Sequence, residues 1–510
     1  MGSAYERLLV EVKRLGCLRE VLELLTWDLE VGMPIGAEQA RADQNETISH
    51  LAHELLVSPH LRQLLEEAER EAAPELGSED KDPYSLQRPE IRAHLLRRVR
   101  REIEKNTRVP SQVASQLTAA AAKAQSVWLK ARQAKDFGLF QEALERVVEL
   151  CRQQAECIGY QGHIYDALLD IYEPGMSTAQ VDKLFSQLRP RLVDLVKRIA
   201  KAPAPSKKVL ERSYPVSVQR NFCQRLMIDM GYDWTRGRVD DVVHPFCASF
   251  STSDVRVTNH FREDCVTKAL FTALHETGHA LYEQGSPAAW LHTPLEGGAS
   301  MAVHESQSRL WENIVGRSRP FWEHYYPIFQ AYYPAQTAGI GVEEFYKAIN
   351  SVQPSFIRIE ADEVTYSLHI MLRFELEKAL IEGSLEVKDL PAAWNEAMRD
   401  YLGVVPPDDG QGCLQDVHWP SALFGYFPTY ALGNLIGAQT WQVMGRDLDL
   451  DSLLRQGELG KLRQWLESRL YRWGQRLYPQ ELLQEVLGQE LSAQPFIDYL
   501  EAKYAPLYNL

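Results

Sequence analysis

The feature that most constrains this chain is a helical spacing of apolar residues that recurs along almost its whole length. Apolar positions in residues 4–30 follow one another at intervals of three and four, which places them on one face of a helix. The same analysis predicts helices at residues 89–107, 111–135, 138–158, 179–201, 343–350, 366–384, 451–475 and 480–503. A large, mainly α-helical body is therefore expected for the 510 residues.

Strand signals are few. Residues 248–260, with the sequence ASFSTSDVRVTNH, are rich in Ser, Thr and Val and predict a short strand or hairpin before a long helix. Segments 73–90 and 202–206 contain proline or glycine and predict loops, but neither resembles a flexible interdomain linker. We therefore expect one domain over residues 1–510, with a small β element near the functional site.

Charge and composition exclude two classes of protein. The chain has 55 Lys and Arg against 70 Asp and Glu, a net charge of −15, and so acidic a surface repels nucleic-acid phosphates. The uncharged stretch 419–445 is long enough to span a membrane, but prolines, glycines and side-chain amides interrupt it. We interpret this stretch as protein interior, either the wall of a large cavity or the centre of the core.

The cysteines indicate a reducing compartment. Seven are scattered along the chain, and no pair has the C-x-x-C spacing of a zinc ribbon or a redox motif. The N-terminus, MGSAYERLLVEVKRL, has no apolar core of the kind that a signal peptide needs. These features predict unpaired thiols and a cytoplasmic location.

One predicted helix carries a metal-binding pattern. His275, Glu276 and His279 form H-E-x-x-H within FTALHETGHALYEQG, and on a helix the two imidazoles lie on one face, one turn apart. Glu276 lies at the adjacent edge, where a carboxylate can take a proton from an attacking water. A surface helix could carry this pattern by coincidence, but burying three ionisable groups among apolar turns is costly without a metal ion.

A catalytic metal site of this type needs a third protein ligand and an open position. Five downstream residues have suitable side chains: Glu283, His292, Glu296, His304 and Glu305. Glu283 is one turn further along the same helix and is expected to face outward. Glu305 lies in MAVHESQSRLWEN, where the apolar spacing predicts a second helix. Spacing alone leaves the choice open.

Taken together, these segments resemble the carboxypeptidase Taq family of thermostable metallocarboxypeptidases. The resemblance rests on HETGH, HESQSRLWEN, HPF at 244–246, D-x-R-x-T at 254–258, I-R-x-x-A-D at 357–362 and G-x-x-Q-D-x-H-W at 412–419. The segments WDLEVGMP at 27–34 and GYFPTYALGN at 425–434 are also similar to family segments. The similarity covers nearly the whole chain, and residues 72–92 are expected to be a local loop variation.

The resemblance implies a fold and a cofactor. The fold is a mainly α-helical zincin, related in architecture to neurolysin and angiotensin-converting enzyme, with a deep central groove. Helices within about residues 1–200 would flank the groove, and residues from about 240 to 440 would carry the metal site. The implied ligands are His275, His279 and Glu305, which would hold one zinc ion per chain that cobalt can replace. A homodimer acting on peptides with a free C-terminus is also implied.

Release of a C-terminal residue requires a group that binds its carboxylate, and an arginine fork suits that task. The chain has many arginines, so the family motifs make the choice: Arg358 first and Arg256 second. The alternatives are a structural ion pair of Arg358 with Glu360 or Asp362, and a role for Arg256 in bracing the β element against the helix that carries His275 and His279. Gln415 resembles a substrate-contacting residue, and Asp416 resembles its structural support.

The family's chemistry also suggests which groups stabilise the negative oxygen of the tetrahedral intermediate. His418 and Tyr426 are the expected donors, Tyr430 is the rival of Tyr426, and packing in the core is the alternative. Glu276 is expected to take a proton from the attacking water and pass it to the leaving amine. A broad groove would tolerate many released residues. The rival functions are an endo-acting or dipeptide-releasing peptidase on the same scaffold, and a non-catalytic peptide-binding protein.

Overall fold

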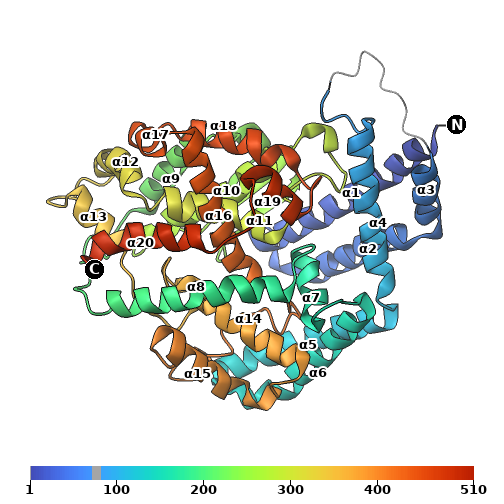
Figure 1. Cartoon of the computed structure of the whole chain (residues 1–510), viewed down its shortest axis with the longest axis horizontal. Coiled ribbons are helices and arrows are strands. Elements are labelled where there is room, and N and C mark those ends of the chain that lie inside the picture. Colours follow the sequence, from blue (N-terminus) through green and yellow to red (C-terminus); the bar gives the residue numbers. More distant parts are fainter. Residues whose placement is uncertain (1, 72–81) are drawn as a thin grey trace.

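The computed structural model describes residues 2–71 and 82–510, and helices dominate both ranges (Figure 1). Nine α-helices precede a small sheet in the described residues: α1 (Ala4–Val31), α2 (Glu38–Val57), α3 (Pro59–Arg70), α4 (Pro89–Arg108), α5 (Ser111–Ala134), α6 (Gln141–Ile158), α7 (Ile164–Tyr172), α8 (Thr178–Ile199) and α9 (Val216–Met230). Eleven follow it: α10 (Val266–Gln284), α11 (Met301–Arg309), α12 (Arg319–Tyr332), α13 (Val342–Ile349), α14 (Tyr366–Glu382), α15 (Leu390–Leu402), α16 (Pro428–Asp447), α17 (Leu450–Gln456), α18 (Leu459–Arg469), α19 (Pro479–Leu487) and α20 (Gln494–Tyr508). The predicted mainly α-helical class is confirmed.

Most predicted helices appear within a few residues of their expected bounds, but two of them are divided. The segment 451–475, predicted as one helix, forms α17 and α18 with a break at Gly457, where φ is 71°. The segment 480–503 forms α19 and α20 with a break that begins at Gly488, where φ is 68°. Glycine adopts this left-handed conformation at little cost and so ends a helix that the apolar spacing alone would continue.

The three strands form one small mixed sheet in the order β1-β3-β2. The predicted hairpin in residues 248–260 is confirmed, because β2 (Cys247–Ser251) pairs antiparallel with β3 (Asp254–Asn259). The third strand, β1 (Val239–Asp241), pairs parallel with β3 and was not predicted. Trp27 of α1 packs on Ala248 and Phe250 of β2, so the sheet lies against the first helix of the chain.

The uncharged stretch 419–445 lies in the interior, as predicted. It supplies most of α16, whose residues from Ala431 to Thr440 are all buried, and α16 packs against α11. Within residues 2–71 and 82–510, no helix is long and apolar enough to cross a membrane. Of the two predicted loops, 202–206 lacks regular structure. Residues 73–81 of the other, 73–90, lie outside the described residues, and so do residues 72–81 of the loop variation expected at 72–92.

Besides the small cluster of Trp27, Ala248 and Phe250, the described residues form two larger apolar cores. The larger core extends from α5 to α20, and the smaller one joins α1, α2, α3 and α4, which lie together at one side of the molecule (Figure 1). Trp290 and Leu295, from the segment between α10 and α11, complete the smaller core. We propose that both cores belong to the single domain predicted for residues 1–510, because residues near the metal-binding helices bury part of the N-terminal helices.

Candidate active site

Three predicted metal ligands come together between α10 and α11. His275 and His279 lie one turn apart on α10, and Glu305 reaches them from α11. Oε2 of Glu305 is 3.6 Å from Nε2 of His275 and 3.5 Å from Nε2 of His279. One ligand atom from each side chain lies within 4.8 Å of the other two. The helices therefore place two imidazoles and one carboxylate around one point.

Glycines allow α11 to approach its neighbours closely enough for this geometry. A Cβ added at Gly278 of α10 would lie 2.7 Å from the carbonyl oxygen of Gln307. A Cβ added at Gly433 of α16 would lie 2.7 Å from Cγ of Glu305. Because real Cβ atoms do not approach other atoms so closely, a side chain at either glycine would push α11 away from the histidines.

The ring nitrogen of His275 that faces away from Glu305 has its own partner. Nδ1 of His275 lies 2.8 Å from Oε2 of Glu312, and Nη1 of Arg309 donates to the same oxygen at 3.2 Å. Glu312 lies in a π-helix, η5 (Leu310–Val315), that follows α11 without interruption. Such local widening of a helix is frequent at functional sites. The carboxylate fixes the orientation of the imidazole and leaves Nε2 for a metal ion.

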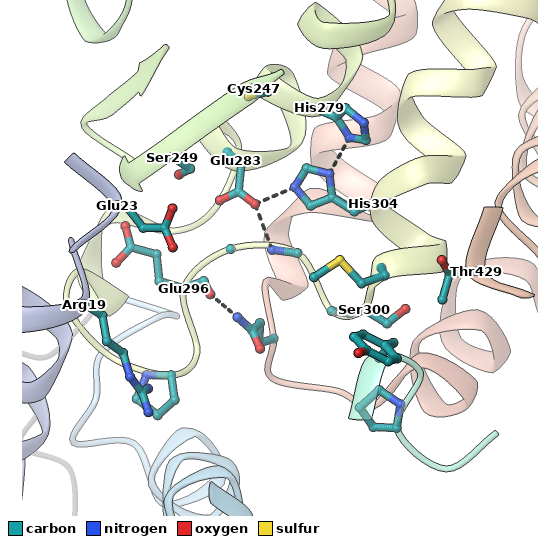
Figure 2. A pocket seen from close by; sticks show the side chains of 18 of the residues that line it. Arg19, Glu23, Cys247, Ser249, His279, Glu283, Glu296, Ser300, His304 and Thr429 are labelled. Carbon is teal, nitrogen blue, oxygen red and sulfur yellow. Dashed lines mark hydrogen bonds and ion pairs between the residues drawn. The ribbon is translucent and has the colours of Figure 1, made fainter. Parts of the chain in front are cut away.

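His279 is held by a chain of two further side chains. Its Nδ1 lies 2.5 Å from Nδ1 of His304, and Nε2 of His304 lies 2.6 Å from Oε1 of Glu283 (Figure 2). The prediction that Glu283 faces outward is therefore wrong, since its side chain is buried and directed at His304. His304 and Glu283, which were considered as third ligands, therefore hold the predicted ligand His279 in place.

The donor set fits a divalent cation. Arg309 donates through Nε to Oε1 of Glu305 at 2.7 Å, and the Ser308 hydroxyl donates to Oε2 at 2.9 Å, so the carboxylate is fixed as well. Two imidazoles and a carboxylate, with their outer atoms bonded to other residues, are the usual protein ligands of a catalytic Zn²⁺. The remaining rival ligands are engaged elsewhere: His292 pairs with Glu20, and Glu296 accepts from two backbone N–H groups.

Glu276 lies beside the histidines and is directed into the cavity described below. Its side chain is buried, and none of the described residues forms a hydrogen bond or an ion pair with it. Burial raises the pKa of Glu276 to about 7. Glu276 thus differs from Glu305 and Glu312, whose carboxylates form ion pairs with Arg309.

A cavity of about 1110 Å³ opens onto the three ligands. Figure 2 shows His279 and His304 at one side of it and Arg19 and Glu23 of α1 at the other, with Glu283 between them. The walls also include residues of α4, α7, β2, α11 and α16, so N-terminal and C-terminal helices enclose it together. Predicted site residues that line it are His275, Glu276, His279, Glu305, Arg358, Tyr426 and Tyr430.

Arg358 lies in this wall, in a buried cluster with Asp416 and Arg373. Its Nη2 is 2.8 Å from Oδ1 of Asp416, and Nη2 of Arg373 is 2.6 Å from Oδ2. Burial favours the protonated form of Asp416, but the two guanidiniums hold the pKa of this carboxyl below its usual range. The expected structural alternative, an acid adjacent to Arg358 in the motif, is not its partner. One carboxylate balances two guanidiniums, which leaves positive charge at the cavity.

Tyr366 connects this arginine to the metal ligands and was not predicted. Nη1 of Arg358 donates to Oη of Tyr366 at 3.3 Å, and the guanidinium of Arg309 lies 4.1 Å from the centre of the same ring. Arg309 in turn binds Glu305. Tyr366 lines the cavity, and only its place at the start of α14, shortly after the I-R-x-x-A-D motif, could have drawn attention to it.

Three residues of the G-x-x-Q-D-x-H-W motif do not line the cavity. The Gln415 side chain accepts from the Arg358 backbone N–H at 2.9 Å and donates to carbonyl oxygens of its own loop, so it supports Arg358. Asp416 binds Arg358 and Arg373, which is a different role from supporting Gln415. His418 lies behind Tyr430, with Nε2 3.1 Å from the tyrosine Oη.

Arg256 lies in the sheet and not among the cavity-lining residues. It forms an ion pair with Asp254 at 2.8 Å, and its guanidinium lies 4.4 Å from the centre of the Trp27 ring and 4.8 Å from that of Phe250. These contacts join β3, β2 and α1. The alternative to substrate binding was that Arg256 braces the β element against the helix of His275 and His279; the contacts found here brace it against α1 instead.

The chain is similar to known proteins over nearly its whole length. Residues 7–504 match the carboxypeptidase Taq (M32) metallopeptidase family. The chain is 40% identical to thermostable carboxypeptidase 1 of Thermus thermophilus over an alignment of 518 positions, which covers 99% of each protein. It is 37% identical to carboxypeptidase 1 of Bacillus subtilis, and that alignment covers 98% of this chain and 97% of the relative. Its fold matches the crystal structure of an M32 carboxypeptidase from Deinococcus radiodurans with a TM-score of 0.95, at 37% identity and with 99% and 100% of the two chains covered. Because the family model matches residues 7–504 and the relatives are similar over nearly their full length, the chain belongs to the carboxypeptidase Taq (M32) family of metallocarboxypeptidases.

Proposed function

We propose that this metallocarboxypeptidase releases single residues from the free C-terminus of peptides, with broad preference for the released side chain. The observation that carries the proposal is the position of Arg358, whose cluster has two guanidiniums for one carboxylate and faces the cavity of the metal ligands. A buried, incompletely balanced guanidinium attracts an anion. The terminal carboxylate of a peptide is the anion that would place a peptide bond near the ligand cluster.

We propose His275, His279 and Glu305 as the ligands of one Zn²⁺ per chain, which Co²⁺ can replace. When bound, the cation supplies Lewis acidity toward the scissile carbonyl and the attacking water. Glu276 takes a proton from that water and delivers it to the leaving amine. Its freedom from other hydrogen bonds supports this role, because a carboxylate fixed by arginines could not change partners during the reaction.

The negative oxygen of the tetrahedral intermediate needs donors from the protein. We propose Tyr426 and Tyr430 for contact with this oxygen, because both line the cavity. His418 is proposed to act through its contact with Oη of Tyr430, which orients that hydroxyl. Gln415 is proposed to hold the backbone of Arg358, and Arg256 to brace the sheet against α1.

Two other functions would use the same scaffold. An endo-acting or dipeptide-releasing peptidase would need no carboxylate anchor at Arg358, and a peptide-binding protein would need no free carboxylate at Glu276. The surplus charge at Arg358 favours the carboxypeptidase over the first, and the unpartnered Glu276 favours it over the second.

The anchor is tested by steady-state kinetics of Arg358→Lys on a peptide with a free C-terminus. Lysine keeps one charge but loses the fork, so kcat/KM falls about 10- to 100-fold, mainly through KM. Arg225→Lys is the matched control, because Arg225 pairs with Asp229 on the surface. An unchanged KM in a folded Arg358→Lys protein would exclude Arg358 as the anchor.

We also propose a homodimer in the cytoplasm. Large apolar side chains are exposed along α1, α2 and the turn between them: Val10, Val21, Leu24, Leu29, Ile35 and Leu51. Exposure of this kind on neighbouring elements is typical of association surfaces. All seven cysteines are free, which suits a reducing compartment. Light scattering on the purified chain measures the first proposal, and a monomer at micromolar concentration would contradict it.

A further inference from the structure

A second group of side chains of metal-ligating types lies beside the cavity, where Glu20 and His292 form part of the wall. Cys17 and Glu20 of α1 meet His292, which belongs to the segment between α10 and α11. One ligand atom from each lies within 4.8 Å of the other two. The Glu20 carboxylate flanks the imidazole, with Oε1 2.6 Å and Oε2 2.8 Å from Nδ1 of His292. No residue of this group belongs to the His275, His279 and Glu305 cluster.

The fold brings these side chains together in a specific way. Cys17 and Glu20 are three residues apart and so lie on one face of α1. The preceding residue, Gly16, touches the opposing segment: a Cβ added there would lie 2.2 Å from the carbonyl oxygen of His292. Only a glycine at position 16 therefore allows α1 to approach the backbone of His292 so closely.

The backbone of His292 is also held in an unusual conformation. Its φ is 64°, in the left-handed region that residues other than glycine seldom adopt. The backbone N–H of His292 donates to Oε2 of Glu296 at 2.8 Å, which helps to keep this conformation. The imidazole of this residue is directed at Glu20, whose carboxylate oxygens lie 2.6 and 2.8 Å from Nδ1.

The local charge favours a cation. Glu23 of α1 and Glu296 add carboxylates at the same end of the cavity, as Figure 2 shows. Arg19 on the same helix is paired with Glu102, and among the described residues Glu20 forms an ion pair with His292 alone. The Glu20 carboxylate, the Cys17 thiol and the His292 imidazole therefore lie together beside a cavity that Glu23 and Glu296 also line.

We propose that Cys17, Glu20 and His292 form a second divalent-cation site, selective for ions of the Zn²⁺ class. Thiolate, imidazole and carboxylate are the three ligand types of protein zinc sites, and a water would complete four-coordination. Binding converts the Cys17 thiol to a thiolate and releases its proton to solvent. The ion ties α1 to the segment that leads into α11, and so fixes the N-terminal wall of the cavity relative to the helix that carries Glu305. The site is independent of the reaction proposed above.

Cobalt spectroscopy separates the two sites, because only the second contains sulfur. The full-length, zinc-loaded protein is dialysed free of loosely bound metal and titrated with Co²⁺. We expect a saturable thiolate-to-cobalt charge-transfer band in the near ultraviolet. Cys17→Ser removes the band and weakens binding of the added ion at least ~10-fold. Cys157→Ser, which changes a thiol in α6 far from this group in sequence, leaves the band intact.

Two further variants distinguish a built site from a lone reactive thiol. His292→Asn keeps a residue that tolerates the left-handed backbone, and Glu20→Gln keeps the shape of the carboxylate. Both are expected to weaken cobalt binding at least ~10-fold and to shift or abolish the band. A band unchanged in both variants would show an isolated thiolate and overturn the proposal. Binding of the added ion without any charge-transfer band would overturn it as well.

Discussion

Oε2 of Glu312 lies 2.8 Å from Nδ1 of His275, on a π-helix that directly follows the helix of Glu305. One short stretch of chain therefore contributes a proposed metal ligand and the group that orients another ligand. When the Nδ1–H group of His275 donates a hydrogen bond to this carboxylate, Nε2 carries the lone pair. Nε2 faces Glu305 and the proposed metal site.

Glu312→Gln is expected to lower the metal affinity of the protein about 10- to 100-fold. The amide still accepts a hydrogen bond, but it no longer increases the basicity of the imidazole. Competition with a chromophoric chelator measures the affinity. Glu323→Gln, which changes a surface carboxylate paired with Arg455, serves as the control. Equal affinity in the Glu312 variant and the wild type would show that this contact does not support the metal site.

Glu276→Gln and Glu305→Ala are expected to separate catalysis from metal binding. The first removes the proposed proton acceptor and leaves the ligands, so turnover falls about 10²- to 10⁴-fold with metal content unchanged. The second removes a ligand, so metal content falls together with activity. Mass spectrometry of the native protein gives metal content, and a peptide assay gives turnover. Full turnover in Glu276→Gln, or a full metal complement in Glu305→Ala, would refute the corresponding role.

Glu377 is a buried carboxyl away from the metal ligands that makes stability depend on pH. Tyr165 Oη, Trp419 Nε1 and the backbone N–H of Gly425 donate to it at 2.6, 2.9 and 3.1 Å. Burial nevertheless raises the pKa of Glu377 from its ordinary 4.5 to about 7. Between these values the folded state binds more protons than the unfolded state, so this contribution to stability is lost as the pH rises from about 4.5 through 7.

The expected size of this loss is about 3 kcal/mol in the free energy of unfolding. Chemical denaturation of the wild type and Glu377→Gln across this pH range measures it. The difference in the free energy of unfolding between the wild type and Glu377→Gln is greatest below pH 4.5. Above pH 7 this difference is smaller by about 3 kcal/mol, because glutamine does not ionise. Glu375→Gln, a change at a partly exposed neighbour on α14, controls for general effects. A difference that does not vary with pH would contradict the raised pKa.

Local patterns in the sequence were enough to predict the helical class and the grouping of His275 with His279, because both follow from spacing along one helix. The family resemblance was needed to select Glu305, since its place depends on how α11 packs between Gly278 and Gly433. Contacts between side chains of separate elements were beyond prediction. Glu312 and the His304–Glu283 pair are of this kind, and Glu283 was expected to point the other way.

Motif membership also proved a poor guide to orientation. Gln415 and His418 belong to a family motif, yet neither lines the cavity. The Gln415 amide donates to carbonyl oxygens of the loop that carries it, and His418 lies behind Tyr430. Arg256 likewise packs on Trp27, a partner more than two hundred residues away in sequence. Such long-range packing has no signature in a single sequence.

The most direct test of the account is the cleavage pattern of an N-acetylated peptide compared with the same peptide amidated at its C-terminus. Mass spectrometry over time follows both, with and without a chelator and with zinc or cobalt added back. The account predicts a ladder that loses one residue at a time from the free C-terminus only, stopped by the chelator and restored by metal. Internal fragments from both peptides would contradict it and would remove Arg358 as the group that selects the bond.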